Sequence, residues 1–123
     1  MRLTRAQREI VRNRFGGKCA YCGCDLPDRW HADHFEPVVR MDWLRPGEAP
    51  VRPENHRLEN MMPACPQCNI SKHSLSLEEW RNWLAGHVNS LNQHHSVYRL
   101  AKSFGLVQET GREVVFYFER KSA

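Results

Sequence analysis

The sequence predicts a small α+β domain, with helices near both ends and a central segment of loops and short strands. Apolar residues recur at helical spacing before residue 16 and after residue 75, whereas all seven prolines lie between residues 27 and 66. Proline removes a backbone donor and fixes φ, so no helix of ordinary length fits the central segment comfortably. A chain of 123 residues is one domain's worth of sequence, and we expect a single domain over residues 1–123.

The first helix is expected over residues 4–15. Thr4 and Gln7 have the spacing of a capping box, and Gly16-Gly17 is a typical stop. Its basic and apolar residues fall on opposite faces, with Arg5, Arg8 and Arg12 on one and Leu3, Ala6 and Ile10 on the other. We expect the apolar side to be buried and the arginines to form either a solvated face or phosphate contacts.

The central segment is expected to hold a short strand over residues 30–35 and a short helix that opens at residues 69–72. Such a segment cannot be stabilised by burial alone, because it is short of apolar periodic elements. The stretch Arg40–Arg57, with Arg45 and Arg52 inside it, is longer than a minimal hairpin needs. It is interpreted either as a DNA-contacting loop or as an insertion.

The C-terminal extension is expected over residues 76–119. Ser76 and Glu79 match a second capping box, and apolar residues follow at helical spacing through Leu91. Residues 96–104 are predicted to form a further short helix, ended by Gly105. Two strands of a short β-hairpin are predicted at 106–107 and 113–119. The aromatic residues of this extension are expected in the core: Trp80, Trp83, Phe116, Tyr117 and Phe118.

The charge balance is only mildly basic. The net charge is +4 with a pI near 9.0, which is common on surfaces without any special partner, so it does not identify a nucleic-acid binder by itself. No window approaches the roughly 18 consecutive apolar residues of a membrane span, and no apolar run follows the charged N-terminus. We expect a soluble, cytoplasmic protein with no membrane partner.

Four of the five cysteines form two CxxC pairs, Cys19 with Cys22 and Cys65 with Cys68. Structural zinc takes four ligands, and each CxxC turn presents two sulfurs to one ion, so we expect one structural Zn²⁺. Such an ion contributes on the order of 10 to 16 kcal/mol in small peptides, comparable to the roughly 5 to 15 kcal/mol net stability of a whole domain. Cys24 is expected to be a bystander; the alternative is that it replaces Cys22.

Once four cysteines hold zinc, four other polar residues near them remain for other chemistry: Asp33, His34, Asn69 and His73. Asn69 and His73 are four apart, so on a helix they project from one face, where oxygen and nitrogen ligands could meet a divalent ion. The alternative for Asn69 is an ordinary helix N-cap. Neighbours in a regular strand point to opposite faces, so Asp33 and His34 can both face one phosphate only at a bulge or a strand end.

Three segments resemble the zinc-knuckle branch of the HNH endonucleases, the ββα-metal nucleases. They are CAYC at 19–22, HADHFEP at 31–37 and ENMMPACPQCNISKH at 59–73, in the family's order. Asp33-His34 matches the family's Asp-His pair, Asn60 its middle Asn, and Asn69 its metal-binding Asn or His. The resemblance covers residues 19 to about 73 and implies a zinc-braced ββα-metal core.

The resemblance implies a metal-dependent endonuclease that hydrolyses DNA phosphodiester bonds. His34 would be the general base, a role that suits a histidine because its pKa lies near the working pH. Asp33 and Asn69 would bind one Mg²⁺, Mn²⁺ or similar ion, a hard cation that prefers oxygen ligands. Asn60 would brace the loop that carries the base.

Two further residues next to this motif have alternative interpretations. His73 falls where some family members place another metal-binding His, and it would bind metal or phosphate or neither. Lys72 is interpreted either as a phosphate contact or as a solvated lysine.

A rival interpretation is a zinc-ribbon module that binds nucleic acid without cutting it, and a third is a zinc-braced protein-interaction domain. A binding module has no reason to keep Asp33, His34, Asn60 and Asn69 together. The nuclease resemblance points to a bacterial or phage-encoded protein whose partner is DNA. The sequence leaves open whether one or both strands are cut, which sequence is preferred and whether the chain forms a homodimer.

Overall fold

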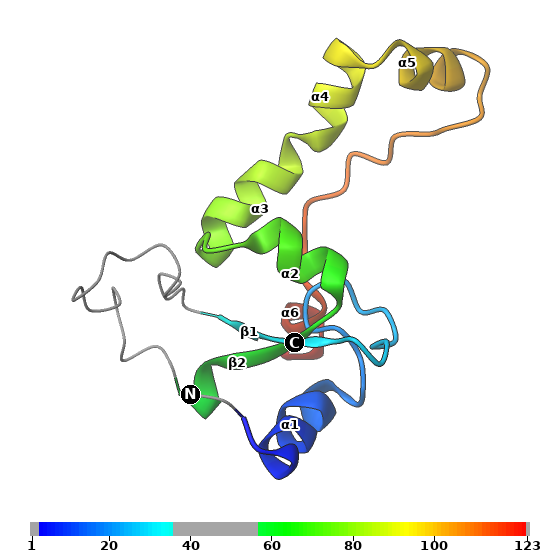
Figure 1. Cartoon of the computed structure of the whole chain (residues 1–123). Coiled ribbons are helices and arrows are strands. Elements are labelled where there is room, and N and C mark those ends of the chain that lie inside the picture. Colours follow the sequence, from blue (N-terminus) through cyan, green and yellow to red (C-terminus); the bar gives the residue numbers. More distant parts are fainter. Residues whose placement is uncertain (1–2, 36–56, 123) are drawn as a thin grey trace. The chain divides into compact units, whose positions relative to one another are not determined.

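The computed structural model describes residues 3–35 and 57–122, drawn in colour in Figure 1. The chain divides into two compact units, one of Met1–Leu77 with Val115–Ala123 and one of Glu78–Val114. Among the described helices, none is long and apolar enough to cross a membrane. Apart from Arg57, the stretch interpreted as a DNA-contacting loop or an insertion lies outside the described residues.

The first unit is built on a two-stranded hairpin followed by a helix. β1 (His31–His34) pairs antiparallel with β2 (Met61–Ala64), which places His34 opposite Met61. The short 3-10 turn η4 (Leu58–Asn60) leads into β2. α2 (Pro66–Lys72) begins with a proline at its first turn, where the missing N–H costs nothing, and packs against β1. The order strand, strand, helix confirms the predicted ββα core.

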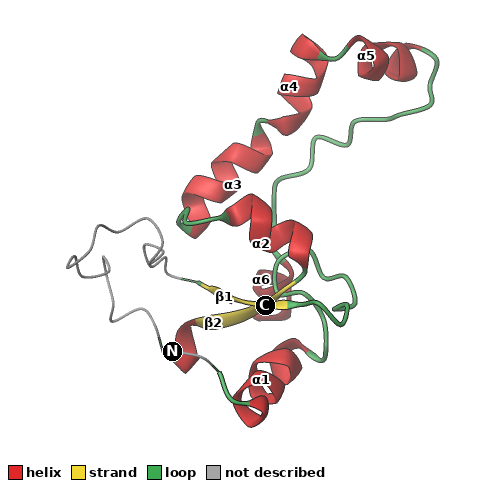
Figure 2. Ribbon diagram, in the orientation of Figure 1, coloured by secondary structure: helices red, strands yellow, loops and turns green. Residues whose placement is uncertain are grey.

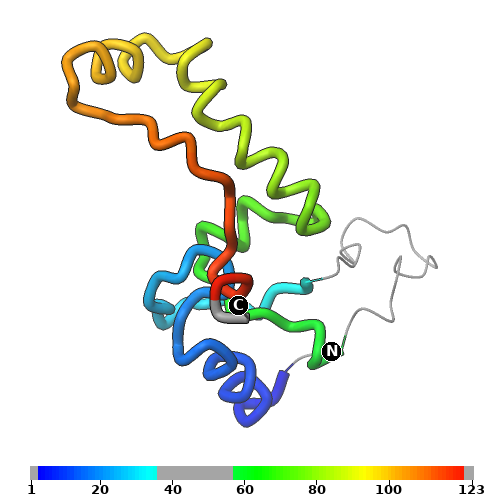
Figure 3. Tube along the Cα trace, turned by 180° about the vertical axis from the view of Figure 1, so that it is seen from behind, coloured from blue at the N-terminus to red at the C-terminus, as the bar shows by residue number. Residues whose placement is uncertain are grey.

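Helix α1 (Arg5–Arg12), continued by the 3-10 turn η1 (Asn13–Phe15), lies on the opposite side of the hairpin from α2 (Figures 1 and 3). Its capping box is confirmed: the Gln7 N–H donates to Thr4 Oγ1 at 3.1 Å, and the Thr4 N–H donates to Gln7 Oε1 at 2.9 Å. Gly16 ends the segment with φ of +63°, as the predicted stop requires.

The buried side of α1 is not the predicted one. Val11 is completely buried, whereas Ile10 is 56% exposed and Ala6 is exposed. Arg8 lies on the inner side, with its guanidinium carbon 4.2 Å from the centre of the Trp30 ring. Because a guanidinium stacks favourably on an indole, Arg8 packs instead of joining a solvated basic stripe, and that part of the prediction is wrong.

The C-terminal end of the chain forms a helix, α6 (Tyr117–Ser122), and not a strand. Figure 2 draws the residues between α5 and α6 as loop, so the predicted hairpin at 106–107 and 113–119 is wrong. The aromatic run packs instead: Phe116 is 3% exposed, and the rings of Phe116 and Phe118 stack at 6.1 Å. The Tyr117 and Phe118 N–H groups donate to the carbonyls of Tyr21 and Ala20, which ties α6 to the first CxxC turn.

The second unit contains most of α3 (Leu77–Ala85), together with α4 (His87–His94) and α5 (Ser96–Ser103). The helix predicted to continue through Leu91 is divided at Gly86, the residue type that weakens a helix interior most after proline. Trp80 is buried as predicted, but Trp83 is 54% exposed. The helix predicted at 96–104 is confirmed by α5.

Candidate metal centre and active site

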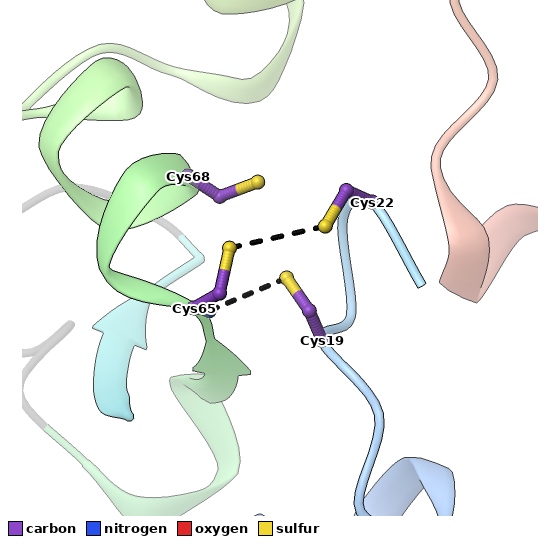
Figure 4. Close-up of side chains that lie close together, drawn as sticks. All are labelled: Cys19, Cys22, Cys65 and Cys68. Carbon is purple, nitrogen blue, oxygen red and sulfur yellow. Dashed lines mark hydrogen bonds between the residues drawn. The ribbon is translucent and has the colours of Figure 1, made fainter. Parts of the chain in front are cut away.

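The four cysteines of the two CxxC pairs converge on one point (Figure 4). Cys19 and Cys22 come from the loop after α1, and Cys65 and Cys68 from the start of α2; all four sulfurs lie within 4.8 Å of one another. The Cys22 and Cys65 sulfurs are 3.8 Å apart. Four sulfurs about 2.3 Å from a tetrahedral zinc are separated by about 3.8 Å, so the cluster fits zinc.

The protonation of the cluster also favours a cation. The hydrogen bond from Cys68 lowers the pKa of Cys19 to about 4, and the same bond, with burial, raises the pKa of Cys68. The Cys65 backbone N–H donates to Cys19 Sγ at 3.4 Å, which further stabilises a thiolate there. Four packed sulfurs cannot all carry negative charge without a positive partner, and a bound Zn²⁺ would supply it.

Cys24 is not one of these four cysteines, although its side chain hydrogen-bonds with those of Cys22 and Cys65. Within residues 3–35 and 57–122, the four cysteines are the only set of three or more His, Cys, Asp or Glu side chains arranged around one point, and Cys22 belongs to it. Cys24 is exposed, and its backbone carbonyl accepts a hydrogen bond from the Cys19 N–H at 2.8 Å. This geometry agrees with the expectation that Cys22, and not Cys24, completes the cluster.

Asp33 lies buried on β1, in contact with two side chains from other elements. Tyr21 donates its hydroxyl to Asp33 Oδ2 at 2.7 Å, and the ammonium nitrogen of Lys72 lies 3.2 Å from the same oxygen. Burial, followed by the charge of Asp33, raises the pKa of Tyr21 far above its usual value, so the hydroxyl keeps its proton and acts as a donor. The carboxylate is therefore paired and hydrogen-bonded, as a buried charge must be.

Lys72 occupies a place that neither interpretation anticipated. Its side chain is completely buried, and Nζ also donates to the backbone carbonyl of His34 at 2.8 Å. The alternative of a solvated lysine is wrong. A completely buried ammonium cannot reach a phosphate on the surface, so Lys72 as a phosphate contact is not retained either. The ammonium instead pairs with the buried carboxylate of Asp33.

His34 is the last residue of β1 and is half-buried. A strand end is one of the two conditions under which Asp33 and His34 can serve one site. The next N–H, that of Phe35, donates to the Asn60 carbonyl at 2.8 Å, and Asn60 itself is 4% exposed. Asn60 thus contacts the backbone next to His34, as a bracing residue would.

Asn69 lies inside α2 and His73 directly after it, where the His73 N–H still donates to the Asn69 carbonyl at 3.1 Å. Asn69 is half-buried, and Cys65 holds the N-cap position, so the N-cap alternative for Asn69 is wrong. His73 follows the end of α2 with φ of +57° and is exposed. Asn69 is also a neighbour of Lys72, three residues on along α2, and Lys72 contacts β1.

The arginines of α1 and η1 differ in their exposure and in their contacts. Arg5 is exposed and Arg12 half-buried. Arg14, which the sequence did not single out, donates through its guanidinium to the carbonyls of Leu58, Glu59 and Met61. These carbonyls surround Asn60, so Arg14 holds the turn that carries it. Nothing in the spacing of the sequence marks this contact, because it joins residues more than forty positions apart.

The oxygen donors on β1 and α2 fit a hard divalent cation in their chemistry. The Asp33 carboxylate, which also contacts Tyr21 and Lys72, offers oxygen of the kind that such a cation prefers. The Asn69 amide offers a second oxygen of the type that Mg²⁺ and Mn²⁺ accept. The Lys72 ammonium beside Asp33 weakens the attraction of this carboxylate for a second positive charge.

Comparison with known proteins identifies the same segment. Residues 19–75 match the family model described as HNH endonuclease. A protein of Bacillus subtilis (strain 168) named "SPbeta prophage-derived putative HNH endonuclease YoqL" is 31% identical over 100 residues, which cover 81% of this chain and 39% of that protein. The chain thus spans about two fifths of the length of this relative.

No solved structure matches the chain significantly. The matched segment 19–75 nevertheless contains every part of the ββα unit described above: both cysteine pairs, β1, β2 and α2. Through this segment, the chain belongs to the HNH endonuclease family.

Proposed function

We propose that this protein is a metal-dependent endonuclease that hydrolyses phosphodiester bonds of DNA. The observation that carries the proposal is the ββα unit braced by four cysteines, in which β1 carries Asp33 and His34 and the adjoining α2 carries Asn69. Family membership supports the reaction class.

His34 is the proposed general base. Its imidazole takes a proton from the attacking water, and the strand end at which it lies is half-exposed, so a substrate can approach. Asn60 supports the base without touching the substrate, through its carbonyl bond to the Phe35 N–H. Arg5 and Arg12, on the partly exposed side of α1, are the proposed phosphate contacts of the helix.

Asp33 and Asn69 are the proposed ligands of the catalytic ion, Mg²⁺ or Mn²⁺. When bound, such an ion supplies positive charge against the charge that develops on the phosphate and on the leaving 3′-oxygen. His73, just past α2, is the proposed additional ligand or phosphate contact. The four cysteines hold Zn²⁺ only as scaffold, because four thiolates leave no open coordination position.

Replacing the base tests the reaction directly. His34→Ala should lower Mg²⁺-dependent cleavage of supercoiled plasmid by about 100- to 10,000-fold, the usual contribution of a general base. His94→Ala is the matched control, since His94 is an exposed histidine at the end of α4. Both variants should keep their zinc and their affinity for DNA. Nicked or linear product from His34→Ala at the wild-type rate would exclude His34 as the base.

The same assay separates the rival class. A zinc-ribbon module would bind the plasmid with or without added Mg²⁺ but leave it supercoiled in both cases. An endonuclease gives nicked circles or linear DNA with Mg²⁺ and leaves the plasmid uncut without a divalent ion.

The ion ligands can be tested without turnover. Asn69→Ala should weaken Mn²⁺ binding at least about tenfold in titration calorimetry, because loss of even an outer-shell partner costs that much. Gln67→Ala, an exposed position on the same helix, should leave the affinity unchanged. Asp33→Asn should behave like Asn69→Ala. If all three variants bound Mn²⁺ with the affinity of the wild-type protein, the ligand assignment would be removed and the base assignment would remain.

A further inference from the structure

The buried contacts around Asp33 join both halves of the cysteine cluster to the strand that carries His34. Tyr21 lies between Cys19 and Cys22, and Lys72 is the last residue of the helix that carries Cys68. Both side chains reach Asp33 Oδ2, the Tyr21 hydroxyl at 2.7 Å and the Lys72 ammonium at 3.2 Å. Each half of the cluster therefore delivers one side chain to the residue next to His34.

Lys72 also holds the backbone at the strand end. Its ammonium donates to the His34 carbonyl at 2.8 Å, while the following N–H, that of Phe35, donates to the Asn60 carbonyl at 2.8 Å. The peptide group between His34 and Phe35 is thus held at its oxygen by α2 and at its nitrogen by η4. These two bonds leave the imidazole untouched and fix the backbone from which it projects.

Burial makes this arrangement costly. Lys72 is 0% exposed and Asp33 is 6% exposed, so neither charge is hydrated to any useful extent. A buried ion pair often stabilises a fold no better than apolar side chains of the same volume. Stability alone therefore does not account for the burial of Tyr21, Asp33 and Lys72 together. A role in fixing the position of β1 relative to both CxxC turns does account for it.

We propose that Tyr21 and Lys72 are positioning residues through which the four-cysteine cluster sets the place of His34. The inference rests on the proposed function, in which His34 is the base. Occupancy of the cluster by zinc fixes the first CxxC turn and the start of α2, and the two side chains pass that geometry to Asp33 and to the His34 carbonyl. Loss of either contact moves the base without removing the zinc.

The second unit offers matched controls for the experiment. Tyr98 donates to Glu109 at 2.7 Å, and the Lys102 ammonium lies 3.2 Å from the same carboxylate, so both contacts have the same kind and length as those at Asp33. Tyr21→Phe and Lys72→Met are compared with Tyr98→Phe and Lys102→Met. The measurements are zinc content, kcat and KM for Mg²⁺-dependent cleavage, and the NMR signals of the His34 imidazole without added Mg²⁺.

Tyr21→Phe and Lys72→Met should keep one zinc per chain and lower kcat about 10- to 100-fold, as expected for a displaced reacting group, with little change in KM. The His34 ring signals should shift in both variants. The two control variants should change neither kcat nor these signals.

Wild-type kcat and unshifted His34 signals in zinc-loaded Tyr21→Phe would overturn the proposal. If Lys72→Met does not fold, Tyr21→Phe decides alone, because it keeps the ring that packs edge-to-face on Phe116 and Phe118. If the wild-type protein cuts no DNA, the proposed function fails separately. In that case, shifted His34 signals in Tyr21→Phe still support the coupling, and unshifted signals refute it.

Discussion

Gly23 is the position in the first CxxC turn that least tolerates a side chain. Its φ is +81°, and a Cβ there would lie 2.7 Å from Tyr117 Cδ1 and 3.2 Å from Cγ, in the part of the ring nearest the backbone. Gly23→Ala should therefore destabilise the zinc-loaded protein by more than the roughly 1 to 2 kcal/mol that left-handed backbone costs a residue with a Cβ. Denaturant unfolding followed by circular dichroism measures the change.

Gly16→Ala separates backbone strain from the clash. Gly16 also has a positive φ, +63°, but a Cβ at this position would meet no atom within 4 Å, so only the backbone strain applies. An equal loss of stability in the two alanine variants would mean that the contact with Tyr117 contributes nothing. A larger loss at Gly23 assigns the difference to the packing of α6 on the first CxxC turn.

At the scale of elements, Glu109 connects the loop after α5 to two helices through hydrogen bonds and an ion pair. Its Oε2 accepts hydrogen bonds from Asn92 of α4 at 2.8 Å and from Tyr98 of α5 at 2.7 Å, and it pairs with Lys102. These groups, Asn92 first, lower the pKa of Glu109 below its usual 4.5. Because the folded pKa is the lower one, the stabilisation is complete above the usual value and is lost as the pH falls through the folded value.

Hydrogen exchange of the α5 amides tests this connection. Protection factors should fall between about pH 6 and about pH 3 in the wild-type protein, and Glu109→Gln should have low protection at both values. Glu113→Gln, which changes an exposed carboxylate on the same loop, should behave like the wild-type protein. Unchanged protection in Glu109→Gln would show that the loop is held by other contacts.

For the whole molecule, zinc is the largest single contribution to the first unit that the structure implies. Cys65→Ser should lose zinc and unfold the unit, because structural zinc contributes on the order of 10 to 16 kcal/mol, as much as the net stability of a typical domain. Cys24→Ser makes the same chemical change at a cysteine that is not one of the four and should keep both zinc and melting temperature. A Cys65→Ser protein that melts normally would contradict the bracing role.

Removal of the ion from the wild-type protein should have the same effect as Cys65→Ser. A strong zinc chelator should abolish the cooperative thermal transition of the first unit, and added Zn²⁺ should restore it. Added Mg²⁺ should not, because thiolates favour the softer ion. Restoration by Mg²⁺ would mean that the cluster is not a zinc site.

The sequence by itself determined the parts that depend on short-range spacing. The capping box of Thr4 and Gln7 acts across one helical turn, each CxxC pair is a single turn, and β1 lies within the strand predicted at 30–35. The helix expected to open at 69–72 begins three residues earlier, at Pro66. The spacing of the two CxxC pairs was enough to predict the four-cysteine cluster, and the resemblance of the motifs to the HNH endonucleases implied the ββα core.

Only the tertiary structure decided which residues meet across the chain. Tyr21 reaches Asp33 from 12 positions away, and Lys72 reaches the His34 carbonyl from 38 positions away. Local patterns therefore suggested an exposed Lys72, a buried Ile10 and a strand at 113–119. The attraction of a buried carboxylate, the stacking of Arg8 on Trp30 and the packing of Phe116 against Tyr21 outweigh those local preferences.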